Sequence, residues 1–390
     1  MNLRSIGKSS ANKTFLASCV LLSLSGLAQA ATYYVSPGGN DASTGDPYAP
    51  FQHISRGVAA AQAGDTVVVM DGTYDNEGQL ADGGGGGSAV ILRNSGVPGA
   101  PITIMAQNRG SAILNAASSA RSSLGCYGAF AYFDASYVSY VVIQGFVIEN
   151  ACLAGVRING NAHDITVKWN EIRNIGNWNN PAGTMSPSGS YVNSNEYNIT
   201  FDGQLFHDIG GGSNVNQQHA IYSYASNLIV INNIFFNQVH GWDIQIAGGS
   251  NIFIGNNTFA YANPNRDGQI ILWESQPISN LVIENNIFYQ PPSNAVVSWQ
   301  AGSINGCSIQ NNLTTAGSIW DNGSNCAVAN NLVGVDPNFV NGLYGPLDFH
   351  LQPGSPAVGA GIIFPFATLD LENRPRPTNA GLDLGALQTY

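Results

Sequence analysis

A short phrase of alternating apolar and polar residues recurs along this chain. Its pattern is apolar-x-apolar-x-x-Asn-x-apolar, and LIVINNIF, IFIGNNTF and LVIENNIF are clear copies. The sixth position of successive copies, at intervals of 19 to 34 residues, falls at Phe146, Asn170, Gln204, Asn233, Asn257, Asn286, Asn312 and Asn331. Such intervals are typical of a solenoid in which each repeat forms one coil.

Each copy predicts two short strands that are separated by a polar corner. A third short strand precedes most copies, as in HAIYSYASN, WDIQIAGGSN and GQIILWESQPISN. The strands alternate with period two, and no helical period separates them. The pattern therefore predicts an all-β fold, a right-handed parallel β-helix that forms a single-stranded solenoid of about eight or more coils.

The asparagines of the phrase have a mechanical explanation. Equivalent residues of neighbouring parallel coils lie about 4.8 Å apart. An asparagine amide at an inward corner can therefore bond both to its own corner and to the asparagine of the next coil. We interpret the Asn-Asn pairs as a structural ladder rather than as a binding site.

The two ends of the chain depart from the repeat. Residues 51–64 predict an amphipathic helix, with Ile54, Val58 and Ala61 on one face, that caps the open hydrophobic end of the solenoid. Near the C-terminus the repeat is lost and prolines become frequent, and we expect this tail to cover the last coil or to pack along a side. The expected parts of a single β-helix domain, 31–390, are an N-terminal cap and first strand at 31–75, coils at 76–335, and a C-terminal cap and tail at 336–390.

The first thirty residues predict a secretory signal peptide. Arg4, Lys8 and Lys13 precede the apolar run FLASCVLLSLSGLA, which is followed by Gln29 and Ala30. This run is too short to span a bilayer. We therefore expect residues 1–30 to be a signal peptide and the protein to be secreted, extracellular or periplasmic, with no membrane span.

The charge balance narrows the classes of partner. Without residues 1–30, which hold three of the 13 basic residues and none of the 24 acidic ones, the net charge is -14. Nucleic acids and anionic membranes need a basic surface, so we exclude them as partners. We expect a monomer that acts on a polysaccharide. One or two arginines, or calcium as the one candidate cofactor, would suffice to hold an acidic sugar.

The cysteines predict disulfide bonds. Four cysteines remain after the first thirty residues, and their spacing suggests the local pairs Cys126 with Cys152 and Cys307 with Cys326. Export favours disulfides. A zinc site is disfavoured because no CxxC or His-rich spacing accompanies these cysteines.

Both ends of the chain resemble those of a known group of proteins. The segment YYVSPGGNDASTGDPYAPFQHISRGVAAAQAGDTVVVMDGTY and the closing segments LDFHLQPGSPAVGAG and AGLDLGALQ are similar to those of exported right-handed β-helix proteins, namely pectate lyases and related polysaccharide lyases. The resemblance implies the fold and export, but lyases, hydrolases, uronate epimerases and adhesins share this scaffold. The similar pectate lyases use a lysine base near a calcium site of several aspartates. The only lysine after residue 30 is Lys168, which we interpret as a surface residue on the second strand of its coil.

The first strand of each coil is expected to carry the site, because long insertions at 174–189 and 209–218 precede such strands and could wall a groove. If the apolar residues face inward, period-two alternation points their neighbours outward. The expected outward residues are Arg157, Asn159, Tyr191, Asn193, Tyr222, Tyr224, Asp243, Gln245, Gln269 and Trp273. Aromatic rings beside amide groups favour contact with carbohydrate.

The candidate catalytic groups lie in and beside this column. We single out Asp243 as the central carboxylate, and Arg157 as a two-pronged donor to a uronate carboxylate. His219, His240 and Tyr222 are candidate acids or bases. Arg266, Asp267 and Glu274 would complete the site from the next coil.

The prediction is β-elimination of a uronic-acid polymer, pectate-like or alginate-like, by a polysaccharide lyase. Elimination needs a neutralised carboxylate, a base for the C5 proton and an acid for the leaving oxygen. Hydrolysis by Asp243 paired with Asp267 or Glu274 is one alternative. A uronate epimerase and a non-catalytic carbohydrate-binding or adhesin-type β-helix are the others.

Overall fold

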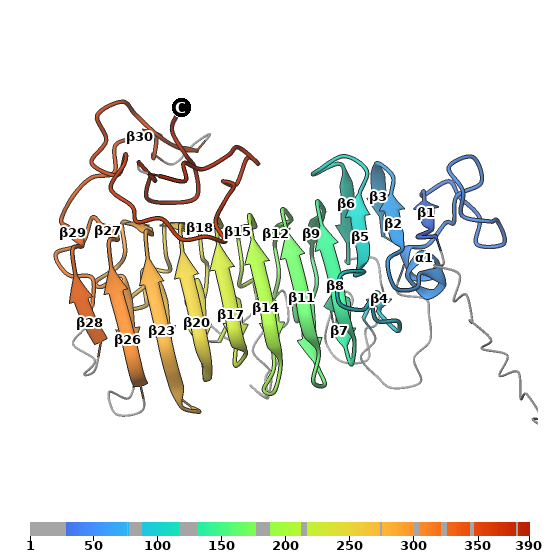
Figure 1. The fold of residues 1–390 in the computed structure, drawn as a ribbon, viewed down its shortest axis with the longest axis horizontal. Helices are drawn as coiled ribbons and strands as arrows, with labels where there is room; N and C mark the ends of the chain where they lie inside the picture. The colour runs from blue at the N-terminus through green and yellow to red at the C-terminus, as the bar shows by residue number, and fades with distance from the viewer. Residues whose placement is uncertain are drawn as a thin grey trace, which may run out of the picture.

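The protein is a right-handed parallel β-helix whose coils each contribute one strand to three parallel sheets (Figure 1). The structure, a computed structural model, describes residues 29–75, 77, 88–116, 131–176, 188–211, 217–273, 275–299, 304–320, 326–343, 347–379 and 381–390. We number the sheets by the order in which a coil visits them. The predicted fold class is thus confirmed.

Within the described residues, sheet 1 has eight strands, sheet 2 has 11 and sheet 3 has ten. The strands of sheet 1 are β4 (Val90–Ile91), β7 (Ala131–Ser136), β10 (Ala154–Asn159), β13 (Ser188–Val192), β16 (His219–Ser223), β19 (Ile244–Ile246), β22 (Ile270–Leu272) and β25 (Val296–Ser298). Those of sheet 2 are β1 (Thr32–Val35), β2 (Thr66–Val69), β5 (Ile102–Ala106), β8 (Ser139–Gln144), β11 (His163–Lys168), β14 (Tyr197–Asp202), β17 (Ser226–Ile231), β20 (Gly249–Gly255), β23 (Ile278–Glu284), β26 (Ile304–Gln310) and β28 (Cys326–Ala329). Those of sheet 3 are β3 (Gly72–Tyr74), β6 (Ala112–Asn115), β9 (Val147–Glu149), β12 (Glu171–Arg173), β15 (Leu205–His207), β18 (Ile234–Phe236), β21 (Thr258–Ala260), β24 (Ile287–Tyr289), β27 (Leu313–Thr314) and β29 (Leu332–Val333).

The interior is filled by like residues stacked from coil to coil. The rings of Phe206, Phe235, Phe259 and Phe288 in sheet 3 lie parallel, with centroids 4.8 to 5.1 Å apart. Stacked apolar columns of this kind bury the hydrophobic face that one coil could not bury by itself. They also hold the strands of the other sheets in a fixed register.

The predicted asparagine ladder lies at the corner between sheets 2 and 3. The Oδ1 atom of Asn257 accepts hydrogen bonds from both the backbone N–H and the Nδ2 of Asn233, at 3.0 and 2.9 Å, and Asn286 does the same for Asn257. The preceding asparagines, such as Asn232 and Asn256, have left-handed φ angles of 58° and 50°. The two asparagines of a pair therefore have different tasks, since the first makes the turn and the second bonds to the next coil.

A helix packs on the N-terminal end of the solenoid, and the C-terminal tail lies along one side. The helix α1 (Ile54–Ala60) is shorter than the predicted 51–64, but it does contribute Ile54 and Val58 to the core. The C-terminal tail packs along a side, where Leu371 and Leu384 join a cluster with sheet 3 residues. It includes the antiparallel pair β30 (Phe339–Asn341) and β31 (Asp348–Leu351), and Figure 1 shows it beside the ends of β15 to β29.

The predicted disulfide bonds and the predicted lack of a membrane span can be compared with the described residues. Cys307 and Cys326 form the predicted disulfide. Cys152 is also disulfide-bonded, and Cys126, its expected partner, lies outside the described residues, as do residues 1–28 of the predicted signal peptide. In the described part of the chain no helix has the length and apolar character that crossing a membrane requires.

Candidate functional site

The outer face of sheet 1 carries two adjacent columns of polar and aromatic side chains. Strand register aligns Asp134, Arg157, Tyr191, Tyr222, Gln245 and Ile271 in the first column. Backbone hydrogen bonds that continue beyond the ends of these strands align the second column. It consists of Ser136, Asn159, Asn193, Tyr224, Ala247, Trp273 and Trp299. Most of the predicted outward residues are therefore brought together on one face.

Side-chain contacts connect successive coils along this face. Asn193 donates a hydrogen bond from Nδ2 to Asn159 Oδ1 at 2.7 Å, and the rings of Tyr191 and Tyr222 stack at 5.4 Å. The hydroxyl groups of Tyr222 and Tyr224 lie 2.9 Å apart. These contacts form a continuous floor across β10, β13 and β16.

Asp243 does not lie on this face, so its predicted exposure is wrong. Its side chain is 1% exposed, and neither carboxylate oxygen has a hydrogen-bond partner among the described residues. Burial raises the pKa of Asp243 well above its ordinary value. Gln269, the equivalent residue of the next coil, is likewise buried rather than outward, and its amide also finds no partner in the described part of the chain.

The alternation fails here because the strand bends. Gly155 and Gly189 occupy the equivalent position in earlier coils, where a Cβ would approach Ile172 and Phe206 of sheet 3 within 2.9 Å. The residue at the position of Asp243 therefore faces the interior. The next residue of the strand, such as Ile244, also faces the interior and belongs to the core. Two consecutive inward residues shift the phase of a period-two pattern, which places Asp243 inside the coil and Gln245 outside.

A first pocket, the tryptophan pocket, opens on the outer face with a volume of about 290 Å³. Its lining residues are Gln217, His219, Tyr222, Trp242, Gln245, Arg266, Trp273 and Trp299. The Arg266 guanidinium lies 4.9 Å from the centre of the Trp242 ring, and the rings of Trp273 and Trp299 stack at 4.6 Å. Trp299 is 60% exposed, so its ring offers a flat apolar surface to a ligand.

His219 lies at the base of the tryptophan pocket in the neutral form. Burial lowers the pKa of His219 to about 3, and the nearby Arg266 charge acts in the same direction. Its Nδ1 accepts a hydrogen bond from the backbone N–H of Trp242 at 3.2 Å. The ring proton must then be on Nε2, which makes His219 a hydrogen-bond donor rather than the base that we considered from the sequence.

Tyr222 and His240 are suited to different proton transfers. Burial and the hydrogen bond to Tyr224 raise the pKa of Tyr222, so its phenol keeps its proton at neutral pH. His240, which lies next to the pocket residues in sequence, has a pKa lowered by burial and by Arg266. Its Nδ1 lies 2.9 Å from Gln218 Oε1, an atom that can only accept, so Nε2 of His240 carries the lone pair.

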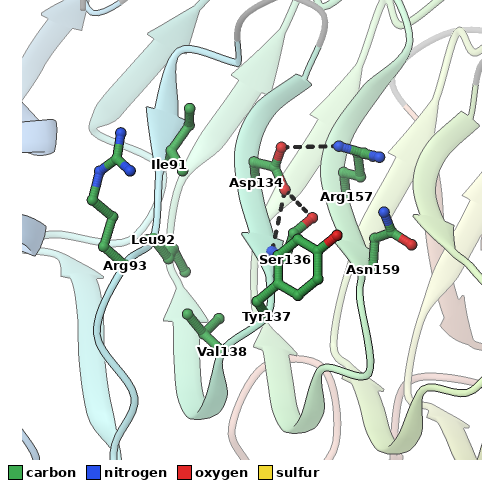
Figure 2. A pocket seen from close by; sticks show the side chains of 9 residues that line it. All are labelled: Ile91, Leu92, Arg93, Asp134, Ser136, Tyr137, Val138, Arg157 and Asn159. Atoms are coloured by element: carbon green, nitrogen blue, oxygen red, sulfur yellow. Dashed lines mark hydrogen bonds and ion pairs between the residues drawn. The ribbon is translucent and has the colours of Figure 1, made fainter. Parts of the chain in front are cut away.

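A second pocket, the arginine pocket, lies toward the N-terminal end of the same face and has a volume of about 410 Å³. Its lining residues are Ile91, Leu92, Arg93, Asp134, Ser136, Tyr137, Val138, Arg157 and Asn159 (Figure 2). The carboxylate of Asp134 lies 3.1 Å from Arg157 Nη1. Sequence reasoning found Arg157 and Asn159 but missed Arg93, Asp134 and Tyr137, because sheet 1 strands were recognised only from β10 onward and the segments around β4 and β7 had no register.

Several other predicted groups lie away from the two pockets. Lys168 projects from sheet 2, where it pairs with Asp202 at 3.2 Å and lies over the Trp169 ring. Glu274 and the centres of both insertions, 177–187 and 212–216, lie outside the described residues. With Asp243 inside the coil, the carboxylate pair expected for hydrolysis loses its central member.

No metal centre is evident in the described part of the chain, where no three His, Cys, Asp or Glu side chains gather in a way that could hold an ion. Asp243, the residue considered as a calcium ligand, belongs to no such cluster in the described part of the chain. The donor set of the described residues therefore does not fit a calcium ion at Asp243.

Comparisons with known proteins agree with the fold and with the resemblance at the chain ends. Residues 33–215 match the family model described as the Pel9A-like, right handed beta helix region. The crystal structure of pectate lyase Pel9A superposes with a TM-score of 0.62 at 16% identity, over 94% of this chain and 98% of that chain. The protein thus has the right-handed β-helix fold of pectate lyase Pel9A. More particularly, it resembles the Pel9A-like pectate lyases.

Two curated relatives match shorter segments. Pectate lyase L of Dickeya dadantii (strain 3937) is 31% identical over 91 residues, which is 23% of this chain and 20% of the relative. The uncharacterized protein YwoF of Bacillus subtilis (strain 168) is 25% identical over 154 residues, 36% of this chain and 28% of the relative. The matched segments therefore span less than a third of either relative.

Proposed function

We propose that this protein is an exported lyase that cleaves a uronic-acid polysaccharide by β-elimination in the tryptophan pocket. The observation that carries the proposal is the combination in one pocket of the Arg266 cation, the exposed Trp299 ring and two neutral hydrogen-bond donors, His219 and Tyr222. An acidic sugar needs a cation for its carboxylate and a flat surface for its ring. The likeness to pectate lyase Pel9A supports the same class of substrate.

Each chemical requirement of elimination has a proposed residue. Arg266 pairs with the uronate carboxylate and stabilises the charge that develops when C5 loses its proton. His240 accepts the C5 proton at Nε2, because its lowered pKa keeps it unprotonated at neutral pH. The C4–O bond then breaks, and the leaving oxygen takes a proton from Tyr222 Oη, while His219 Nε2 can donate a hydrogen bond to it.

Incubation of the secreted protein with uronic-acid and neutral polysaccharides, with and without calcium, tests the proposal. Elimination gives both new reducing ends and the ultraviolet absorbance of an unsaturated uronate. Reducing ends without absorbance would establish hydrolysis instead. Binding without either signal would establish a carbohydrate-binding protein, unless C5 exchanges its proton with solvent, which would identify an epimerase.

Arg266→Ala should lower kcat/KM by about 100-fold, because it removes the donor that stabilises transition-state charge. The matched control is Lys168→Ala, which removes a cation from sheet 2 that already pairs with Asp202. The control should keep its activity. A large loss in the Lys168 variant together with a small loss in the Arg266 variant would move the active site to sheet 2.

A further inference from the structure

The arginine pocket is a second concave site on the outer face of sheet 1. Its Arg157 lies in the same column as Tyr222 of the tryptophan pocket, with only β13 between their strands. At about 4.8 Å per strand, the two residues are separated by roughly 10 Å. We propose that the arginine pocket binds a further uronate unit of the same polysaccharide, so that the polymer lies across the strands and occupies both pockets.

The charge of the pocket points to an anionic ligand. Among the described lining residues, Arg93 and Arg157 provide two guanidinium groups and Asp134 provides one carboxylate. After residue 30 the chain has ten basic and 24 acidic residues, yet three of those ten, Arg93, Arg157 and Arg266, line the two pockets of one face. Such a concentration of positive charge on an otherwise acidic protein attracts an anionic polymer to this face.

Asp134 fixes Arg157 rather than repelling the ligand. Its Oδ1 accepts hydrogen bonds from the backbone N–H and the hydroxyl of Ser136, at 3.1 and 2.5 Å. Its Oδ2 accepts from Ser88 Oγ and Arg157 Nη1, each at 3.1 Å. Figure 2 shows the Asp134 side chain between Ser136 and Arg157, where its charge is matched by protein donors. A guanidinium held at one end is well oriented to receive a carboxylate.

Tyr137 supplies the apolar surface of the site. Its φ of 64° is uncommon for an aromatic residue, and its side chain is 79% exposed. The ring packs over Gly160, where a Cβ would come within 2.5 Å of it. The left-handed φ belongs to the coil corner, where Gly160, the equivalent residue of the next coil, has a φ of 70°, and the Tyr137 ring is exposed beside the arginines. The ring therefore complements the arginines as Trp299 complements Arg266.

The floor between the pockets is suited to a continuous chain. Asn159 and Asn193 are joined by their 2.7 Å hydrogen bond, and Tyr191 stacks on Tyr222. The hydroxyl and amide groups of this floor can bond to sugar hydroxyl groups, and no carboxylate occurs in the β13 segment of either column. An anionic polymer therefore crosses β13 without meeting a like charge from that strand.

The test compares oligosaccharides that can reach both pockets with those that can fill only one. Calorimetric titration would use disaccharides and hexasaccharides of galacturonate and of mannuronate, with a neutral hexasaccharide as the ligand control. Tyr137→Ala and Arg93→Ala should weaken binding of the acidic hexasaccharide about tenfold each, since each removes a ring contact or a charged contact. Neither should alter binding of a disaccharide in the tryptophan pocket. Arg374→Ala, a surface arginine paired with Glu372 on the C-terminal tail, is the matched control.

The inference rests on the proposed function for its substrate class, and the same titrations separate the two. Hexasaccharide binding that depends on Tyr137 and Arg93, in a protein that cleaves no polymer, would support the second subsite and refute the lyase. Cleavage with hexasaccharide affinity that is unchanged in both variants would refute the subsite and leave the lyase intact. Arg157→Lys keeps a charge beside Asp134 but loses the two-pronged geometry. A folded Lys variant with undiminished hexasaccharide affinity would also count against the subsite.

Discussion

The asparagine ladder and the outer face of sheet 1 are both built from columns that take one residue from each coil. In the ladder the residue type is kept from Asn233 to Asn331, and each member bonds to the next. On the outer face the type changes along the first column, from Arg157 to the tyrosines Tyr191 and Tyr222 and then to Gln245. Side chains that hydrogen-bond to their equivalents in the next coil are thus of one residue type, whereas side chains around the open pockets are of several types.

The two regions also differ in what holds them. The ladder asparagines from Asn233 to Asn312 are completely buried, so every lost bond leaves a donor or acceptor away from water. On the outer face Arg157, Tyr191 and Tyr222 are half-exposed, and solvent can replace a lost contact there. Substitutions should therefore cost stability in the ladder and ligand affinity on the outer face, and the predictions below test this division.

Asn257→Ala should destabilise the protein by about 3 kcal/mol or more, because it leaves several buried groups unsatisfied. Asn257 Oδ1 accepts two hydrogen bonds from Asn233, and its Nδ2 donates to Val230 O and to Asn286 Oδ1. The matched control is Asn331→Ala at the half-exposed end of the ladder, where water replaces the lost partner at a cost of about 1 kcal/mol. Urea unfolding of both variants measures the difference. Equal losses would show that burial does not set the strength of the ladder.

Asp243→Asn should stabilise the protein increasingly as the pH rises. Burial raises the pKa of Asp243, so the folded protein retains a proton that the unfolded chain releases above about pH 4. From there up to the folded-state pKa, wild-type stability falls by about 1.4 kcal/mol per pH unit relative to a variant that cannot titrate at this position. Thermal unfolding at several pH values measures this slope.

The control for that series is Asp267→Asn, which changes an exposed carboxylate of the neighbouring coil. Its unfolding curves should stay close to those of the wild type. If Asp243→Asn differs from the wild type by the same amount at every pH, Asp243 does not carry a proton in the folded protein. Its side chain would then have a partner beyond the described residues.

The comparison also explains which features could be predicted from the sequence. The ladder and the fold could be predicted because identical residues recur at coil spacing, and Asn257 and Asn286 are alike for one mechanical reason. The outer residues Tyr222 and Gln245 followed from alternation. Asp243 did not, since the strand bends at its position and two neighbours face inward. Asp134 and Tyr137 were missed because the pattern of a sheet 1 strand was not recognised before β10, and strand pairing places Asp134 beside Arg157.

Trp299→Ala should have the smallest effect on stability and still weaken ligand binding. Its ring is 60% exposed and stacks against Trp273, so the free energy of unfolding should change by about 0.5 kcal/mol or less. Removal of the stacking surface should weaken binding of an acidic hexasaccharide about tenfold. Tyr48→Ala, which removes a ring that is 97% exposed near the N-terminal end, is the matched control and should leave both quantities unchanged. Unfolding and titration on the same samples measure both effects. If Trp299→Ala lowers stability as much as Asn257→Ala does, the outer face is a structural column as well, and the contrast between the two regions fails.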